Sequence, residues 1–296
     1  MIPRRLARLP AALNGGAGPA QQKAGRSANP LRRPAAWLST YGGMIREIAF
    51  TEFKLKYQGS VLGYVWSFAK PLMLFAILYF VFTHVFKLGS SVPHYGHYLL
   101  LGIVLWTYFV DATIGAMVSV VERGDLIRKV YFPRIVIPIA ASVSSLITLT
   151  LNLAVIFVFI VLGGLGFRSS LPIFLVLLLE LFVFSLGCSL LLAALYVRFR
   201  DLRHIWDVFL QLFYFMSPIL YPLTLLPARV RGLLALSPMA QIVEDSRKIL
   251  ITPSTASVTG VLPAPLWLVP YLLPLALLAL GYWYFERTAA QFAEEI

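Results

Sequence analysis

Three lysines lie before or inside one long apolar run, where a charged side chain is unfavourable unless it is paired or reaches water. Lys54 and Lys56 precede the run, and Lys70 lies inside it, directly before Pro71. A charged side chain in a membrane-depth segment either reaches back to the membrane surface or meets an opposite charge. We predict that Lys54, Lys56 and Lys70 attract a diphosphate group to an entrance there. The alternative is that the amine of Lys70 only extends to the membrane surface.

The sequence offers little for catalysis. It contains no Gly-x-x-x-x-Gly-Lys-Ser/Thr phosphate loop, and no His, Cys or carboxylate cluster has metal-ligand spacing. In the polar segment 221–265 only the acids Glu244 and Asp245 lie close together, which is slight support for a membrane glycosyltransferase or polymerase. We therefore expect no catalytic residue, no metal and no cofactor in this chain.

The composition indicates that these residues are carried by membrane helices. Of the 296 residues, 59% are hydrophobic and only 13% charged, and the mean hydropathy is +0.80. Soluble domains contain roughly 25% charged residues. The sequence therefore predicts an all-α, polytopic membrane protein, and the single cysteine, Cys188, is expected to pack as a small apolar side chain.

Apolar runs near the length that crosses a bilayer predict six transmembrane helices. Their predicted bounds are Val61–Phe86, His97–Val121, Ile135–Leu165, Leu171–Val197, Ile205–Leu223 and Leu266–Phe285. With six crossings, 18 of the 25 Lys and Arg residues fall on the side of both termini and 6 on the other. Because cytoplasmic segments are enriched in cations, we expect both termini in the cytoplasm.

Two flanking segments complete the predicted domain organisation. Residues 1–40 are rich in Arg, Pro, Gly and Ala and are expected to form a disordered basic tail, ahead of a membrane domain over 41–296. Residues 221–265 are too polar to cross the membrane but carry apolar patches. They predict short external helices that turn back toward the membrane as a gate, with helix breaks at Ser217-Pro218 and Tyr221-Pro222.

Aromatic side chains recur along one face of the first predicted span and on the fifth. At about 100° per residue, the first set falls within a narrow sector through the whole membrane depth. Flat rings with hydroxyl edges can slide along sugar rings, so we predict that these residues line a substrate path. Ordinary helix packing is the alternative. The residues are Tyr64, Phe68, Phe75, Tyr79, Phe82 and Phe86, with Trp206, Phe209 and Phe213 as a second wall.

Two segments on the cytoplasmic side are predicted to contact a partner protein. Residues 44–58 predict a helix at the membrane surface with two apolar faces, for which a simple membrane anchor is the alternative. The loop after the second span mixes apolar and basic residues and ends at a proline, so a short helix should stop near Tyr131. Its candidate contact residues are Leu126, Ile127, Arg128, Lys129, Phe132, Pro133 and Arg134.

Six motifs in order resemble the permease subunits of ATP-binding-cassette exporters for polysaccharides, O-antigens and teichoic acids. They are KYQGSVLGYVW, LLLGIVLWTYF, LIRKVYFPRIVIP, VRFRDLRHIWD, MSPILYP and LSPMAQIVEDSRKIL. The resemblance extends from about Phe50 to Phe285. Lys70 departs from it, because a neutral polar residue is expected before the proline.

The resemblance implies a function and several partners. It implies a homodimer in the bacterial inner membrane, two copies of a separate ATPase subunit that bind ATP, a coupling helix at 126–134 and an interface helix at 44–58. The implied cargo is a polyprenyl-diphosphate-linked polysaccharide moving outward, with no nucleic acid involved. A small-molecule or drug exporter of the same architecture is the alternative.

Overall fold

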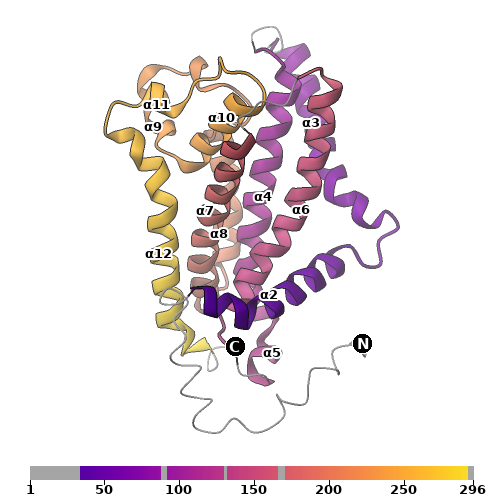
Figure 1. Ribbon diagram of the computed structural model, residues 1–296, viewed down its shortest axis with the longest axis vertical. Helices are drawn as coiled ribbons and strands as arrows, with labels where there is room; N and C mark the ends of the chain where they lie inside the picture. The colour runs from indigo at the N-terminus through magenta and orange to yellow at the C-terminus, as the bar shows by residue number, and fades with distance from the viewer. Residues whose placement is uncertain (1–33, 88–91, 130–131, 166–170, 293–296) are drawn as a thin grey trace.

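The computed structural model describes residues 34–87, 92–129, 132–165 and 171–292, and in these ranges every regular element is a helix (Figure 1). The all-α prediction is confirmed. The predicted basic tail falls mostly on residues 1–33, outside the described residues.

Five helical stretches are long and apolar enough to cross a membrane. They are Gly63–Val85, which joins η3 (Gly63–Val65), α3 (Trp66–Phe80) and the π-helix η4 (Val81–Val85), then α4 (Tyr95–Glu122), α6 (Val136–Leu162), α7 (Leu171–Arg198), and Leu266–Ala289, which joins η7 (Leu266–Leu268) and α12 (Val269–Ala289). Their 23 to 28 residues suit a hydrocarbon core of about 30 Å at 1.5 Å per residue.

The fifth predicted span is shorter than expected. Helix α8 covers Leu202–Met216, only 15 residues, where the sequence predicted 205–223. Ser217 at its end has an extended backbone, because the following Pro218 disfavours the helical conformation for the residue before it. The chain then continues as a buried irregular segment rather than as a helix.

Helix α4 is the centre of the bundle. In its most apolar window 72% of residues are buried, against 11% in Gly63–Val85. Its side chains form one core with residues of α6, α7, α10 and the segment after α8. The space between the helices is therefore filled by α4, and α3 lies at the edge of the bundle (Figure 1).

Proline 71 is accommodated as proline chemistry predicts. It lies buried inside α3 and cannot donate to the carbonyl of Ser67, four residues earlier. Asn152 of α6 donates its Nδ2 to that carbonyl at 3.2 Å, and Asn152 is itself buried. A neighbouring helix thus satisfies the freed group.

Helices α7 and α12 touch through two glycines. A Cβ on Gly187 would lie 2.6 Å from the backbone nitrogen of Leu278, and a Cβ on Gly281 would collide with the carbonyl of Gly187. Without side chains at these positions the two backbones approach closely, which fixes the depth of α12 against α7.

Helix α2 (Pro34–Tyr57) crosses one end of the bundle, near α5 (Gly124–Lys129) (Figure 1). It begins ten residues before the predicted Met44. Among its described side chains, Trp37, Ile45 and Ala49 are buried, and Trp37 and Ile45 join a cluster with α6, α7 and α12, whereas Phe50 and Leu55 are exposed. Phe292 belongs to the same cluster, so both ends of the described chain lie at this end of the bundle.

The opposite end carries the short elements of the predicted gate. They are η6 (Leu223–Leu225), α9 (Ala228–Ala235), α10 (Pro238–Leu250) and α11 (Val258–Val261) (Figure 1). Eleven of the 13 residues of α10 are buried. The helix is packed between α4, α7 and α12, so its polar side chains must find partners inside the protein.

Candidate functional site

The predicted aromatic face of α3 lies at the border between the bundle and the uncovered surface. Tyr64, Tyr79 and Phe86 are 37–63% exposed, whereas Phe68, Phe75 and Phe82 are half-buried. Tyr79 stacks on Tyr95 of α4 and on Phe75, which in turn meets Phe159 of α6 edge-on. The middle of the face therefore also takes part in ordinary helix packing. Met73, Ile77 and Phe80 are the most exposed large hydrophobic side chains of α3, at 59–62%.

Helix α8 has one apolar face turned away from the bundle. Ile205, Val208, Leu212 and Phe215 are 58–65% exposed, and only Leu210 is buried. The predicted second wall is a continuous column of rings, because Trp206 stacks on Phe209 at 5.0 Å and Phe209 on Phe213 at 5.6 Å.

This column is fixed at one side. Trp206 donates its indole N–H to the hydroxyl of Thr113 at 3.2 Å, and Phe213 packs on Trp106 of α4. Phe209 is 46% exposed. Phe209 is therefore the free ring of the column, which means that it is exposed while its two neighbours are anchored to α4.

The three predicted lysines have different surroundings. The amine of Lys56 lies 2.6 Å from the carboxylate of Asp111 on α4, an intramembrane acid for which sequence reasoning named no partner. Lys54 and Lys70 are exposed. Of the three, only Lys56 is in an ion pair among the described residues.

A second ion pair joins the predicted interface helix to the predicted coupling segment. Arg123, directly before α5, lies 2.6 Å from Glu52 of α2, and both side chains are about 20% exposed. Burial raises the pKa of Glu52 to about 7; the Arg123 cation opposes this shift and nearby Glu122 adds to it.

The predicted coupling residues are only partly described. Helix α5 ends at Lys129, and the predicted end near Tyr131 lies outside the described residues. Leu126 and Lys129 are exposed, while Phe132, Pro133 and Arg134 are half-buried, with Phe132 packed against the cluster under α2. The side chains of Ile127 and Arg128 are not among those described.

One of the predicted gate residues, Pro218, contacts a buried cation. Ser217 and Pro218 are buried, and Tyr221 and Pro222 are half-buried. Arg247 of α10 is fully buried and donates to the carbonyls of Tyr98 at 3.0 Å, Ile219 at 2.7 Å and Pro218. These last two carbonyls are free because α8 has ended, so the cation caps the break that Pro218 creates.

One carboxylate completes this group. Glu244 accepts from Arg247 at 3.0 Å and from the hydroxyl of Tyr98 at 2.8 Å. Burial raises the pKa of Glu244, against the effects of Arg247 and of the Tyr98 hydrogen bond. A buried ion pair persists when its remaining hydrogen-bonding groups are satisfied, which the three carbonyls provide for Arg247.

Sequence reasoning missed this group. Arg247 was counted among the charges on the external side that orient the chain, but it is inside the protein. The available signal was Glu244 three residues before Arg247, in the stretch LSPMAQIVEDSRKIL.

Comparisons with known proteins agree with this architecture. The family described as ABC-2 type transporter matches residues 45–251. The O-antigen export system permease protein RfbA of Myxococcus xanthus is 32% identical over 214 residues, 72% of this chain and 82% of the relative. A protein of the same name from Klebsiella pneumoniae is 27% identical over 247 residues, 82% of this chain and 91% of the relative. The chain therefore belongs to the ABC-2 type transporter family.

Proposed function

We propose that this chain is the membrane-spanning subunit of an ATP-driven exporter whose cargo is a lipid-linked polysaccharide, such as an O-antigen, galactan or teichoic-acid-like polymer. The cargo moves from the cytoplasm across the bacterial inner membrane. Family membership and the O-antigen export named for the relatives support this proposal. The structural observation that carries it is the uncovered apolar face of α8.

A path for a polymer has to lie outside α4, because the bundle around α4 is packed with buried side chains. Helix α8 exposes a face of large apolar residues, and α3 exposes another. In this proposal the chain is a homodimer, and the α3 and α8 faces of two copies enclose the path. Its walls are Tyr64, Phe68, Phe75, Tyr79, Phe82, Phe86, Trp206, Phe209 and Phe213.

The rings of these walls suit a moving glycan. Aromatic faces contact the apolar faces of sugar rings, and they lack the directional hydrogen bonds that would hold one sugar in place. Phe209 is the free ring of the anchored column on α8. Ser217, Pro218, Tyr221 and Pro222 form the gate at the far end, held by Arg247.

The cytoplasmic entrance and the contact with the ATPase subunits are at the end that carries α2 and α5. Lys54, Lys56 and Lys70 attract the diphosphate of the polyprenyl-linked glycan, with Lys56 shared with Asp111. Two copies of a separate ATPase bind ATP and contact the coupling segment 126–134. The ion pair of Glu52 and Arg123 then links motion of that segment to α2. The excess of cations at this end supports a cytoplasmic location for both termini.

The proposal is tested by depleting the protein in its native cell and fractionating the lipid-linked glycan. We expect the glycan to accumulate on the cytoplasmic face, and surface polymer to be lost. Re-expression of the intact chain should restore both, whereas a chain lacking residues 126–129 should be inserted in the membrane but inactive.

Normal surface glycan without internal accumulation would overturn the polysaccharide cargo. The small-molecule exporter would then be tested by measuring efflux of lipophilic dyes from the same depleted cells.

A further inference from the structure

A pocket of about 460 Å³ lies where α7 ends and α8 begins. Its charged lining consists of Arg198, Arg200 and Asp201, and its apolar lining includes Leu195 and Ile205. Neither arginine is in an ion pair or a hydrogen bond with the residues that the structure describes. The described part of the chain therefore supplies no counter-ion to these two cations.

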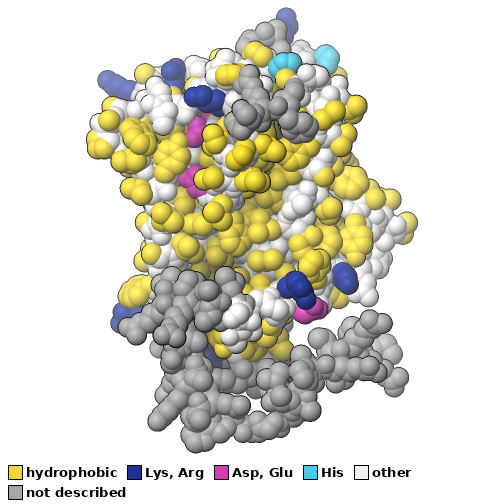
Figure 2. Space-filling model, in the orientation of Figure 1, with side chains coloured by type: hydrophobic (Ala, Val, Ile, Leu, Met, Phe, Trp, Pro, Cys, Tyr) yellow, Lys and Arg dark blue, Asp and Glu magenta, His cyan; other side chains and the backbone are white. Residues whose placement is uncertain are grey.

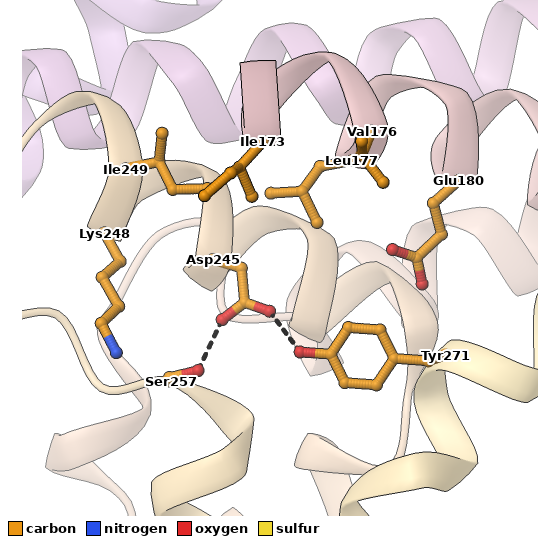
Figure 3. Close-up of a pocket in the computed structure, with 9 residues that line it drawn as sticks. All are labelled: Ile173, Val176, Leu177, Glu180, Asp245, Lys248, Ile249, Ser257 and Tyr271. Atoms are coloured by element: carbon orange, nitrogen blue, oxygen red, sulfur yellow. Dashed lines mark hydrogen bonds between the residues drawn. The ribbon is translucent and has the colours of Figure 1, made fainter. Parts of the chain in front are cut away.

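A second pocket, between α7, α10 and α12, shows the opposite situation (Figure 3). The carboxylate of Asp245 there accepts hydrogen bonds from the hydroxyls of Ser257 and Tyr271, at 2.7 Å each. Arg198 and Arg200 lack partners of this kind in the described ranges. The pocket between α7 and α8 is therefore the one whose charges are open to a ligand from outside.

Both guanidinium groups are held in place without losing their charge. The guanidinium carbon of Arg198 lies 5.6 Å from the ring centroid of Phe199, and that of Arg200 lies 5.4 Å from the ring centroid of Tyr196. An aromatic ring attracts a cation but does not neutralise it, and it leaves the N–H groups at the guanidinium edge free. This ordering lowers the entropy that a ligand has to offset when it binds.

The length of α7 sets the level of the pocket in the membrane. Its 28 residues rise about 42 Å, against roughly 30 Å of hydrocarbon, so the last turn with Arg198 lies among the headgroups. Val197 packs in the same cluster as Trp37 of α2, which places the pocket at the end that carries α2 and α5. On the face shown in Figure 2, Lys and Arg side chains lie toward the two ends and hydrophobic side chains lie between them.

The polarity of the pocket changes in the direction that a lipid requires. Helix α7 runs toward this end of the bundle, and α8 runs back from it, as its contacts with α4 show. Leu195 precedes Arg198 by three residues, and Ile205 follows the start of α8 by three, so each lies about 4.5 Å deeper in the membrane. A phosphate at the arginines therefore leaves its apolar chains pointing into the bilayer.

The charge of the lining favours an anion. Two arginines and one aspartate leave the lining with one net positive charge. Asp201 directly precedes α8, and the start of a helix favours a negative charge, so part of the charge of Asp201 is already balanced there. An anionic phosphate matches this lining, whereas a zwitterionic headgroup also brings an ammonium to a lining that is positive.

We infer that this pocket binds the phosphate of an anionic lipid from the leaflet on the side of α2 and α5. The phosphate lies on Arg198 and Arg200, and the apolar chains begin along Leu195 and Ile205. Two lipids offer this chemistry, which are phosphatidylglycerol and the polyprenyl diphosphate that carries the cargo. The first does not depend on the proposed function, and the second rests on it. In the second case the arginines are an entry point at the foot of α8, in addition to the three lysines.

The test is native mass spectrometry of the purified full-length chain in detergent, titrated separately with phosphatidylglycerol, a polyprenyl diphosphate and zwitterionic phosphatidylethanolamine. We expect the wild type to bind an anionic lipid on the order of tenfold more tightly than phosphatidylethanolamine, as two cations at a lipid phosphate provide. The tighter of the two anionic lipids identifies the source. Arg198→Gln and Arg200→Gln should each weaken its binding several-fold. Ile205→Trp should do so too, by filling the pocket without a change of charge.

The matched control is Arg287→Gln. Arg287 is an exposed arginine near the same end of the bundle, its guanidinium carbon lies 5.4 Å from the ring centroid of Trp283, and it does not line the pocket. This variant should keep the wild-type preference. Because Arg198, Arg200 and Ile205 are also exposed, all four variants should melt like the wild type.

Three results would overturn the inference. They are equal binding of the three lipids by the wild type, an unchanged preference in Arg198→Gln and Arg200→Gln, and a loss in Arg287→Gln as large as in Arg200→Gln. A preference for phosphatidylglycerol in a chain whose depletion leaves surface glycan normal would support this inference and reject the proposed cargo, so the two can fail separately.

Discussion

The guanidinium carbon of Arg247 lies 3.4 Å from the ring centroid of Tyr98, and neither side chain is more than 1% exposed. This stack joins α10 to α4. The same cation holds the carbonyls of Pro218 and Ile219, just after α8 ends. One charged group therefore fixes three segments at the predicted gate.

Removing this cation should destabilise the fold. We expect Arg247→Met to lower the free energy of unfolding by about 3–5 kcal/mol, because Glu244 is left as an unpaired buried acid. Thermal unfolding in detergent measures the effect. Arg229→Met, at an exposed position on α9, is the control and should melt like the wild type. Equal melting of both variants would show that the buried cation does not hold the gate.

The glycine contact between α7 and α12 should tolerate no side chain. Gly187→Ala places a Cβ 2.6 Å from the backbone of Leu278, and neither backbone can rotate away, so we expect a loss of about 1–3 kcal/mol. Gly115→Ala on α4 is matched, since its Cβ would meet nothing within 4 Å. Melting temperatures of the two variants give the comparison, and a Gly187→Ala protein as stable as Gly115→Ala would contradict the close approach.

The pair of Glu52 and Arg123 should make stability depend on pH. Because the pKa of Glu52 is raised from 4.5 to about 7 in the folded state, the folded chain binds more protons than the unfolded chain between these values. The contribution of Glu52 to the free energy of unfolding is therefore full below pH 4.5 and decreases as the pH rises to 7.

This prediction is checked by thermal melting from pH 5 to pH 8. Glu244 has a raised pKa as well and adds a decrease of the same sign, so the Glu52 contribution is read as a difference. Glu52→Gln should flatten the profile, and the exposed Glu47→Gln should leave it unchanged. Identical profiles for Glu52→Gln and the wild type would refute the raised pKa.

A charge swap distinguishes two possible roles of Lys56, which are pairing with Asp111 and binding diphosphate. If Lys56 mainly holds Asp111, the double variant Lys56→Asp with Asp111→Lys should restore export that Lys56→Met lowers. If Lys56 binds diphosphate, the swap should not rescue export. Glycan export in cells is the measurement, and Lys54→Met and Lys70→Met should lower it several-fold in either case. Full export by both of these variants would remove the lysines from the entrance.

The free ring on α8 should matter for transport and not for folding. Phe209→Ala should reduce polymer export several-fold while leaving the melting temperature nearly unchanged, since the side chain is 46% exposed. Trp283→Ala on α12, where the ring is 53% exposed, is the control and should export normally. Equal export by both variants would place the path elsewhere.

The spans could be predicted from the sequence because a bilayer dictates their length. Helices α4, α6 and α7 begin and end within three residues of the predicted bounds. Because proline has no N–H, the sequence alone predicts that Pro71 leaves a carbonyl without its helix partner. It does not predict that Asn152 donates to that carbonyl. The end of α8 was placed seven residues too late, because hydropathy continued past Ser217-Pro218 and outweighed the proline signal.

The charged contacts could not be predicted, for a physical reason. Lys56 and Asp111 are 55 residues apart, and no local pattern relates them. Arginine is a residue type that usually lies at the surface, and Arg247 is buried only because α10 packs under the loops. Periodicity reports which side of a helix is apolar, but pairings between distant helices depend on their depth and rotation.

The length of α8 has a consequence for the surrounding bilayer. Fifteen residues rise about 22 Å, roughly 8 Å less than the hydrocarbon thickness. Lipid beside α8 has to become thinner to match it, at a fraction of a kcal/mol per ångström. Hydrophobic mismatch thus favours covering α8 with protein, so in the proposed homodimer thicker membranes should strengthen the association of the two copies.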